Sequence, residues 1–249
     1  MKKLLLLAAL ILPLLYAPAT SQQPTAEEII ESSENSIKGE TSRGIFRINI
    51  IRTDYTRSMK MEAWWKGNEK ALIIVNEPAR DKGNKTLKIG GEMWNYLANT
   101  ETTIIIPTSM MLQSWMGSDL TNDDIVRESK LTRDYHISMA GSETIGGAEC
   151  WKIKLTPKED APVVWGKLHY WVRKQDKLPA KVNYYNEDGD LVRTFQFSDY
   201  KVMDKRKIPA KWTIMDKKNP GEKTEFIYEN VQFNINIPAQ KFSFRELEK

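Results

Sequence analysis

Side chains that commonly perform metal or nucleophilic chemistry are sparse in this sequence. Its two histidines, His136 and His169, lie 33 positions apart, and neither has a cysteine or second histidine nearby at metal-ligand spacing. The single cysteine, Cys150, falls inside a strand pattern, so we interpret it as a small buried apolar side chain. We therefore predict no metal site and no Cys–His nucleophile, which would need an exposed and activated thiol.

Two adjacent acids, Asp123 and Asp124, are the remaining candidates for chemistry. They fall in the first turn of a short helix that Ser118 or Thr121 could cap, where negative charge is favourable beside free backbone N–H groups. Capping is the simpler interpretation. A buried acid pair for general acid–base catalysis is the alternative, although the sequence offers no third group to complete such a site.

Phosphate-binding and nucleophile motifs are missing as well: there is no Walker loop, no G-x-S-x-G and no G-x-G-x-x-G. Gly90-Gly91 and Gly146-Gly147 stand between strand patterns and not before helices, so they predict hairpin turns. Acidic and basic residues are interspersed, without the basic face that nucleic-acid binding requires. We predict a protein that is not an enzyme, needs no cofactor and binds no nucleic acid.

A surplus of large apolar side chains remains to be explained, with ten methionines and eight tryptophans in the chain. Methionine adapts to irregular apolar ligands, and tryptophan offers a broad apolar face. An ordinary packed core could account for those on strands. The cluster between residues 110 and 116 interrupts the strand pattern, so we predict a flap that covers an apolar ligand cavity. We expect the cavity and its flap to be formed by Met59, Met61, Trp65, Ile73, Met93, Trp94, Ile104, Met110, Met111, Trp115 and Met116.

The elements that must position these residues are mostly strands. Thr25-Ala26-Glu27-Glu28 has the form of a capping box, and Ile29, Ile30 and Ile37 follow at helical spacing, which predicts one amphipathic helix ending near Gly39. After Gly44, apolar and polar residues alternate in short runs separated by turn signals such as Asp188-Gly189. The pattern predicts a mainly β fold of roughly 10–12 antiparallel strands, as a barrel or sandwich.

The first residues predict export. Met1-Lys2-Lys3, the apolar run Leu4–Leu15 and the small residues around Ala17 and Ala19 match a signal peptide over residues 1–19, with cleavage at 21 as an alternative. Its apolar run is too short to span a bilayer, which takes roughly 20 residues. We expect a soluble periplasmic protein with one domain over residues 20–249. Removing the two lysines of the signal lowers the formal net charge from +4 to +2.

Two motifs carry a family resemblance. Residues 90–96, GGEMWNY, are similar to a G-x-x-L-W-x-Y strand, and residues 115–124, WMGSDLTNDD, are similar to an M-G-S-D-F-T-x-D-D-L segment. Over nearly the whole chain after the signal, the sequence resembles the lipoprotein-localisation carrier (LolA-like) superfamily, in its branch of outer-membrane lipoprotein-sorting proteins. The resemblance implies an open, incomplete antiparallel β-barrel with an N-terminal helix and a short helical lid across its concave face.

The resemblance also implies a function: a monomeric periplasmic carrier that takes acyl chains of lipoproteins or lipids from an inner-membrane transporter to an outer-membrane acceptor, with transient membrane contact. An accessory or sensor subunit of an envelope lipid exporter, binding a protein segment, is the alternative. One departure concerns the lid. The best-known carriers fasten it with an arginine near the end of the second strand, whereas Trp65-Lys66-Gly67-Asn68 contains none.

Overall fold

The computed structural model describes residues 23–126 and 131–249. The predicted signal peptide and both cleavage positions lie outside the described residues. No helix in these two ranges is long and apolar enough to cross a membrane.

Thirteen strands form one antiparallel sheet, in the order β6-β5-β4-β3-β2-β1-β13-β12-β11-β10-β9-β8-β7. This confirms the expected mainly β fold, with slightly more strands than the roughly 10–12 predicted. The strands are β1 (Thr41–Ile51), β2 (Thr56–Lys66), β3 (Lys70–Glu77), β4 (Lys85–Ile89), β5 (Glu92–Leu97), β6 (Thr102–Ile105), β7 (Tyr135–Ile145), β8 (Ala148–Pro157), β9 (Lys167–Arg173), β10 (Pro179–Tyr185), β11 (Leu191–Met203), β12 (Arg206–Asp216) and β13 (Lys223–Phe233).

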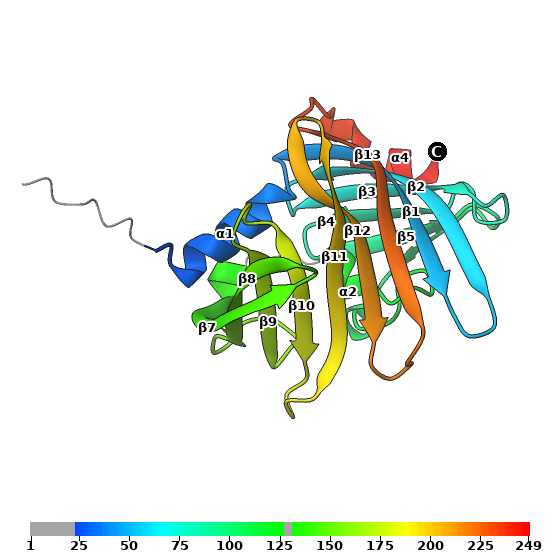
Figure 1. The fold of residues 1–249 in the computed structure, drawn as a ribbon. Helices are drawn as coiled ribbons and strands as arrows, with labels where there is room; N and C mark the ends of the chain where they lie inside the picture. The colour runs from blue at the N-terminus through cyan, green and yellow to red at the C-terminus, as the bar shows by residue number, and fades with distance from the viewer. Residues whose placement is uncertain (1–22, 127–130) are drawn as a thin grey trace, which may run out of the picture.

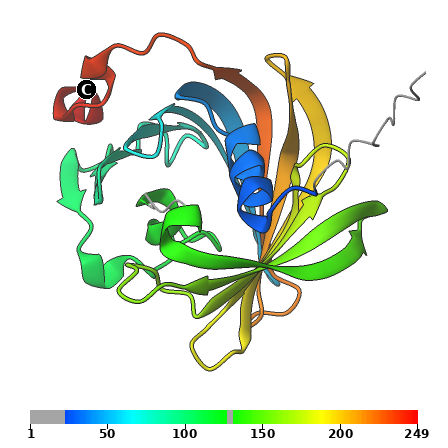
Figure 2. The ribbon, with the colours of Figure 1, turned by 90° about the vertical axis from the view of Figure 1, so that its left-hand side faces the viewer.

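The sheet curls without closing. Its two edges are β6 and β7, which do not pair with each other in the part of the chain that the structure describes. Figure 2 shows the strands arranged around a central space that holds the green segment connecting β6 to β7. Strand alternation produces the concave face: on β1, Phe46, Ile48 and Ile50 are buried while their neighbours are half-buried. The incomplete barrel implied by the family resemblance is therefore confirmed.

Helices and short 3₁₀ turns lie at the ends and inside the curve of the sheet. They are α1 (Ala26–Ser36), η1 (Thr108–Met110), α2 (Asn122–Val126), α3 (Leu131–Asp134), η2 (Ala239–Lys241) and α4 (Phe244–Glu248). The capping box of α1 is confirmed, because Glu28 N donates to Thr25 Oγ1 (3.2 Å) and Thr25 N donates to Glu28 Oε2 (2.9 Å). Buried Ile29 and Ile30 fix α1 against the concave side, next to β7, β9 and β12 (Figures 1 and 2).

The two faces of the sheet have separate apolar clusters. The large cluster fills the concave side and includes α1 and the connecting segment. A smaller one lies on the outer face of β3 and β4, where Leu72 and Leu87 pack beneath Phe242 and Leu247 of the C-terminal segment. Residues that alternate along one strand therefore serve two different cores.

Candidate functional site

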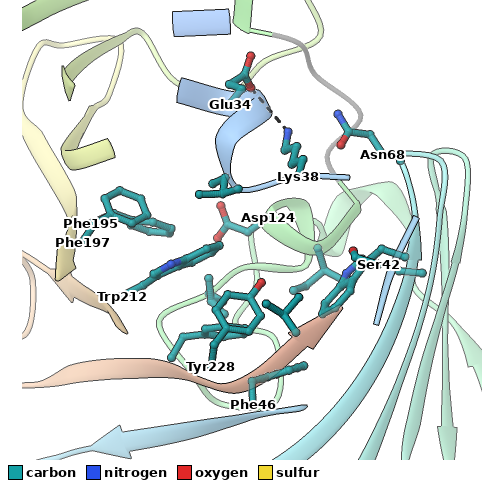
Figure 3. A pocket seen from close by; sticks show the side chains of 18 of the residues that line it. Glu34, Lys38, Ser42, Phe46, Asn68, Asp124, Phe195, Phe197, Trp212 and Tyr228 are labelled. Atoms are coloured by element: carbon teal, nitrogen blue, oxygen red, sulfur yellow. Dashed lines mark ion pairs between the residues drawn. The ribbon is translucent and has the colours of Figure 1, made fainter. Parts of the chain in front are cut away.

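A cavity of about 330 Å³ lies inside the curve of the sheet. The strands form its walls, the C-terminal end of α1 borders it, and the connecting segment with α2 closes one side (Figure 3). It reaches the molecular surface at the α1 end, where the lining side chain of Lys38 is 43% exposed.

Aromatic rings form the principal wall of this cavity. Phe46 of β1 stacks on Phe226 of β13 at 4.4 Å between ring centroids, and Trp212 of β12 stacks on the same ring at 5.0 Å. Tyr228 meets Phe226 edge-on at 4.8 Å, and Phe197 of β11 meets Trp212 at 5.5 Å. Alternation places each ring on the concave face, and strand pairing joins the rings into one continuous surface.

Two tyrosines of the lining remain neutral. Burial raises the pKa of Tyr170 and of Tyr228 far above the usual tyrosine value, because desolvation disfavours the phenolate. Burial thus further favours the neutral phenol of both side chains, which suits apolar surroundings.

A buried ion pair fastens the connecting segment to the aromatic side of the sheet. Arg193 of β11 donates from Nη1 to Asp124 Oδ2 at 2.6 Å and from Nη2 to Asp124 Oδ1 at 2.8 Å. Its side chain is 3% exposed, and its guanidinium lies 4.9 Å from the centre of the Trp165 ring. Thr121 caps α2, one of the two predicted caps, because Asp124 N donates to Thr121 Oγ1 at 3.2 Å. Asp124 Oδ2 accepts in return from Thr121 N at 2.8 Å, so Asp124 completes the cap and forms the ion pair as well. The acid-pair interpretation of Asp123 and Asp124 gains no support from this arrangement.

Two more arginines, one just after β1 and one on β2, bind the same segment. Arg52 donates to Asp119 Oδ2 at 3.0 Å, and Arg57 donates to the carbonyl oxygen of Met116 at 3.2 Å. Asp119 accepts a further bond of 2.6 Å from Thr224 Oγ1. The C-terminal end of β2 carries no arginine, but Arg52, Arg57 and Arg193 all bind the connecting segment.

The structure separates the predicted cavity residues into groups. Trp65, Ile73 and Trp115 line the cavity, and Trp115 Nε1 donates to Thr86 Oγ1 at 3.2 Å. The strand methionines are wholly buried and packed into the core outside that lining; they are Met59, Met61 and Met93. The half-buried methionines of the connecting segment also lie outside it; they are Met110, Met111 and Met116. Met59 and Met116 border a second cavity of about 250 Å³.

Two predicted cavity residues lie elsewhere. Trp94 packs with the outer cluster and meets Phe244 of α4 edge-on at 5.0 Å, because it follows inward-facing Met93 on the strand and must point the opposite way. Ile104 lies on edge strand β6 and is 44% exposed. The assignment of both residues to the cavity lining was wrong.

The histidines and the cysteine lie apart from the cavity. His136 is exposed on β7, and His169 on the outer face of β9 contacts the Tyr185 hydroxyl at 3.2 Å. Cys150 is buried beside Trp171 and Ala180, as predicted, and burial raises the pKa of its thiol. Across the two described ranges, no group of three or more potential ligands from His, Cys, Asp and Glu could hold a metal ion.

Sequence reasoning missed the aromatic wall, although a signal for it was present. Phe195 and Phe197 are two positions apart, as are Phe226 and Tyr228, so each pair shares a strand face. Methionine was given more weight because it is frequent at adaptable binding surfaces. In the folded chain, these paired aromatic residues line the cavity, whereas the strand methionines do not.

Comparisons with known proteins support the fold. A family model with the description "-like: Uncharacterized protein" matches residues 67–249. No protein with a curated description matches.

Three solved structures are similar over most of their length. A DUF1329 family protein from Desulfovibrio piger has a TM-score of 0.80 and 22% identity, covering 89% of this chain and 97% of that one. A putative outer membrane lipoprotein-sorting protein domain from Vibrio parahaemolyticus has a TM-score of 0.77 and 20% identity, and the match covers 90% of this chain and 98% of that one. A LolA superfamily protein from Nitrosomonas europaea has a TM-score of 0.73 and 22% identity, and the match covers 88% of this chain and 98% of that one. The chain thus shares the LolA-like fold.

Proposed function

Because the chain belongs to the family matched over residues 67–249 and has the LolA-like fold, we propose that it is a periplasmic carrier for acyl chains of lipoproteins or lipids. In this role it would receive cargo from an inner-membrane transporter and deliver it toward an outer-membrane acceptor. The proposal needs neither catalysis nor a cofactor.

The aromatic-lined cavity is the observation that carries this proposal. Burial of each methylene contributes about 0.8 kcal/mol, so an acyl chain gains affinity without polar recognition. The rings of Phe46, Trp212 and Phe226 already pack against each other, so the wall needs little ordering when a ligand enters. A preformed apolar cavity with few polar groups is the usual form of a lipid or small-molecule site.

Cargo can enter and leave without release of the connecting segment. Its residues 116–124 are held by the Arg193–Asp124 pair and by Arg52 and Arg57, whereas the lining at the α1 end includes exposed Lys38 and Gly67. We therefore propose the α1 end as the entrance. Handover would follow from contact of this end with a membrane or a partner protein.

Native mass spectrometry of protein purified from the cell envelope under mild extraction tests the proposal. We expect a co-purified lipid mass, and uptake of an added fatty-acyl probe by delipidated protein. Ser42→Phe should reduce uptake because Ser42 lines the cavity (Figure 3), whereas Gln196→Phe on the exposed outer face of β11 is the matched control. A clean apo mass together with refusal of the probe would contradict the proposal. Cross-linking in the envelope that gives only protein adducts would favour the accessory-subunit alternative.

A further inference from the structure

The aromatic-lined cavity and the second cavity lie at successive levels along the same inner face of the sheet. On β3, Ala71 and Ile73 line the first cavity, whereas Val75 lines the second. On β2, Trp65 belongs to the first lining and Met59 to the second. Alternate residues of a strand share one face, so each series runs along the inner face away from the α1 end. The second cavity, about 250 Å³, is therefore the next space beyond the first one.

Trp115 of the connecting segment lies between the two cavities. It lines the first cavity, while the adjacent Met116 lines the second. The Trp115 indole Nε1 donates to Thr86 Oγ1 on β4 at 3.2 Å. Two positions from Thr86 along the chain, Lys88 lines the first cavity on one side and Asn84 lines the second on the other. The indole therefore meets the sheet at the level where one cavity gives way to the other.

Hydrogen bonds fix Trp115 in this position. Its backbone N donates to Leu120 O at 2.7 Å, and its carbonyl oxygen accepts from Ser118 N at 3.0 Å and from Ser118 Oγ at 2.7 Å. Met116 has a φ of 52°, a left-handed backbone conformation that is uncommon outside glycine. Such conformations persist where the surrounding structure imposes them, and they concentrate at functional sites. The turn formed in this way assigns Trp115 and Met116 to different cavities.

We infer that Trp115 limits the length of the cargo's apolar tail, because its indole closes the deep end of the aromatic-lined cavity. This inference rests on the proposed carrier function and adds a residue that selects tail length. A tail that enters at the α1 end would follow the aromatic wall and stop at the indole. The first cavity, about 330 Å³, lies at the lower end of the roughly 300–1,000 Å³ typical of ligand sites, so a long tail has little spare room in it. Without the indole, the second cavity would continue the first.

Binding of saturated fatty acids from decanoate to stearate to the delipidated protein tests this inference, with each acid titrated below its aggregation concentration. Each additional buried methylene should raise the affinity roughly fourfold, until the tail reaches Trp115 and the increase stops. In Trp115→Ala the increase should continue to longer acids, so the longest should bind roughly 10-fold or more tightly than they bind the unsubstituted protein. The matched control is Trp94→Ala, which removes an indole from the outer face and should keep the original limit.

A substitution in the second cavity then shows where the longer tail goes. Val75→Phe places a ring in that cavity, so by itself it should leave the fatty-acid series unchanged, and combined with Trp115→Ala it should restore the original limit. Trp115→Leu should move the limit less and serves if Trp115→Ala does not fold.

Three results would overturn the inference and leave the carrier proposal standing. They are an unchanged limit in the Trp115 variants, a shorter limit in Val75→Phe alone, and an affinity that keeps rising to stearate in the unsubstituted protein. Failure of the unsubstituted protein to bind any of the acids would instead reject the carrier function itself.

Discussion

The inward side chains on the two sides of the curved sheet behave differently. On β2 and β5 they include Met59, Met61 and Met93, which are wholly buried in a packed core. On β11, β12 and β13 they are aromatic rings that border the cavity, including Phe197, Trp212, Phe226 and Tyr228. We call the aromatic side, which lines the cavity of about 330 Å³, the hollow side, and the methionine side the filled side, although Met59 also borders the second cavity and Trp65 of β2 lines the main one.

Side-chain stiffness explains this difference. Methionine is unbranched and has three rotatable bonds, so its side chain adapts readily to irregular gaps in a core. An aromatic ring is rigid and planar, and rings that stack on one another cannot turn into the adjoining space. A ring-lined face therefore keeps a hollow that a methionine-lined face would fill. The most flexible apolar side chains are poor markers of a ligand cavity in this protein.

Loss of Arg193 should have the largest effect, because this residue ties the connecting segment to the hollow side. Arg193→Met leaves Asp124, which is 10% exposed, without its bidentate partner. Removing one member of a buried pair costs about 3–5 kcal/mol, measured as the free energy of unfolding in urea. The control is Arg43→Met, whose pair with Glu62 is 44% exposed at the arginine and should contribute less than about 1 kcal/mol. Equal costs would show that the buried pair does not hold the segment.

Truncation on the filled side should reduce stability without affecting ligand uptake. Met61 is 0% exposed, so Met61→Ala leaves a void in the core and should cost about 2–5 kcal/mol of unfolding free energy. Affinity for an acyl probe, measured on the folded protein by titration, should remain within about twofold of the original. A large loss of affinity would mean that the methionine side contacts the ligand, and the comparison would fail.

Truncation on the hollow side should change ligand binding more than stability. Phe197 borders the cavity on one face, so Phe197→Ala should cost less than the roughly 3–5 kcal/mol of a fully packed phenylalanine. The enlarged cavity should shift the preference toward longer or bulkier acyl chains, which a chain-length series of probes would reveal. An unchanged length preference would place the ligand away from β11.

A charge on the outer face provides the smallest and most pH-sensitive effect. The hydrogen bond from Lys60 lowers the pKa of Glu229 below its ordinary value of 4.5. The stabilisation is therefore complete above that value and disappears as the pH falls through the lowered folded pKa. The Glu229 side chain is 34% exposed, so Glu229→Gln should cost less than about 1 kcal/mol near neutral pH and nothing in strong acid. A cost that persists in strong acid would exclude this charge effect.

Local sequence patterns predicted the elements well, because they depend on neighbouring residues. The capping box at Thr25 and Glu28, the hairpin turns and the alternating strands all form as expected. Trp94 could also have been placed correctly, since it adjoins Met93 and strand neighbours point to opposite faces.

The site itself depends on contacts between distant parts of the chain. Arg193 and Asp124 are 69 positions apart, and no local periodicity pairs them. Alternation predicts that Phe226 and Tyr228 share a face, but only the curvature of the sheet brings them beside Phe46 and around open space. Which inward residues pack and which border a cavity is a property of the whole sheet.

Photo-cross-linking with an acyl chain that carries a diazirine near its end tests the central claim most directly. Peptide mapping should find the label on the hollow side, at Phe195–Phe197, Trp212 and Phe226–Tyr228. Labelling confined to Met59, Met61 and Met93, or to exposed residues such as Ile104, would contradict the claim that the aromatic wall holds the cargo.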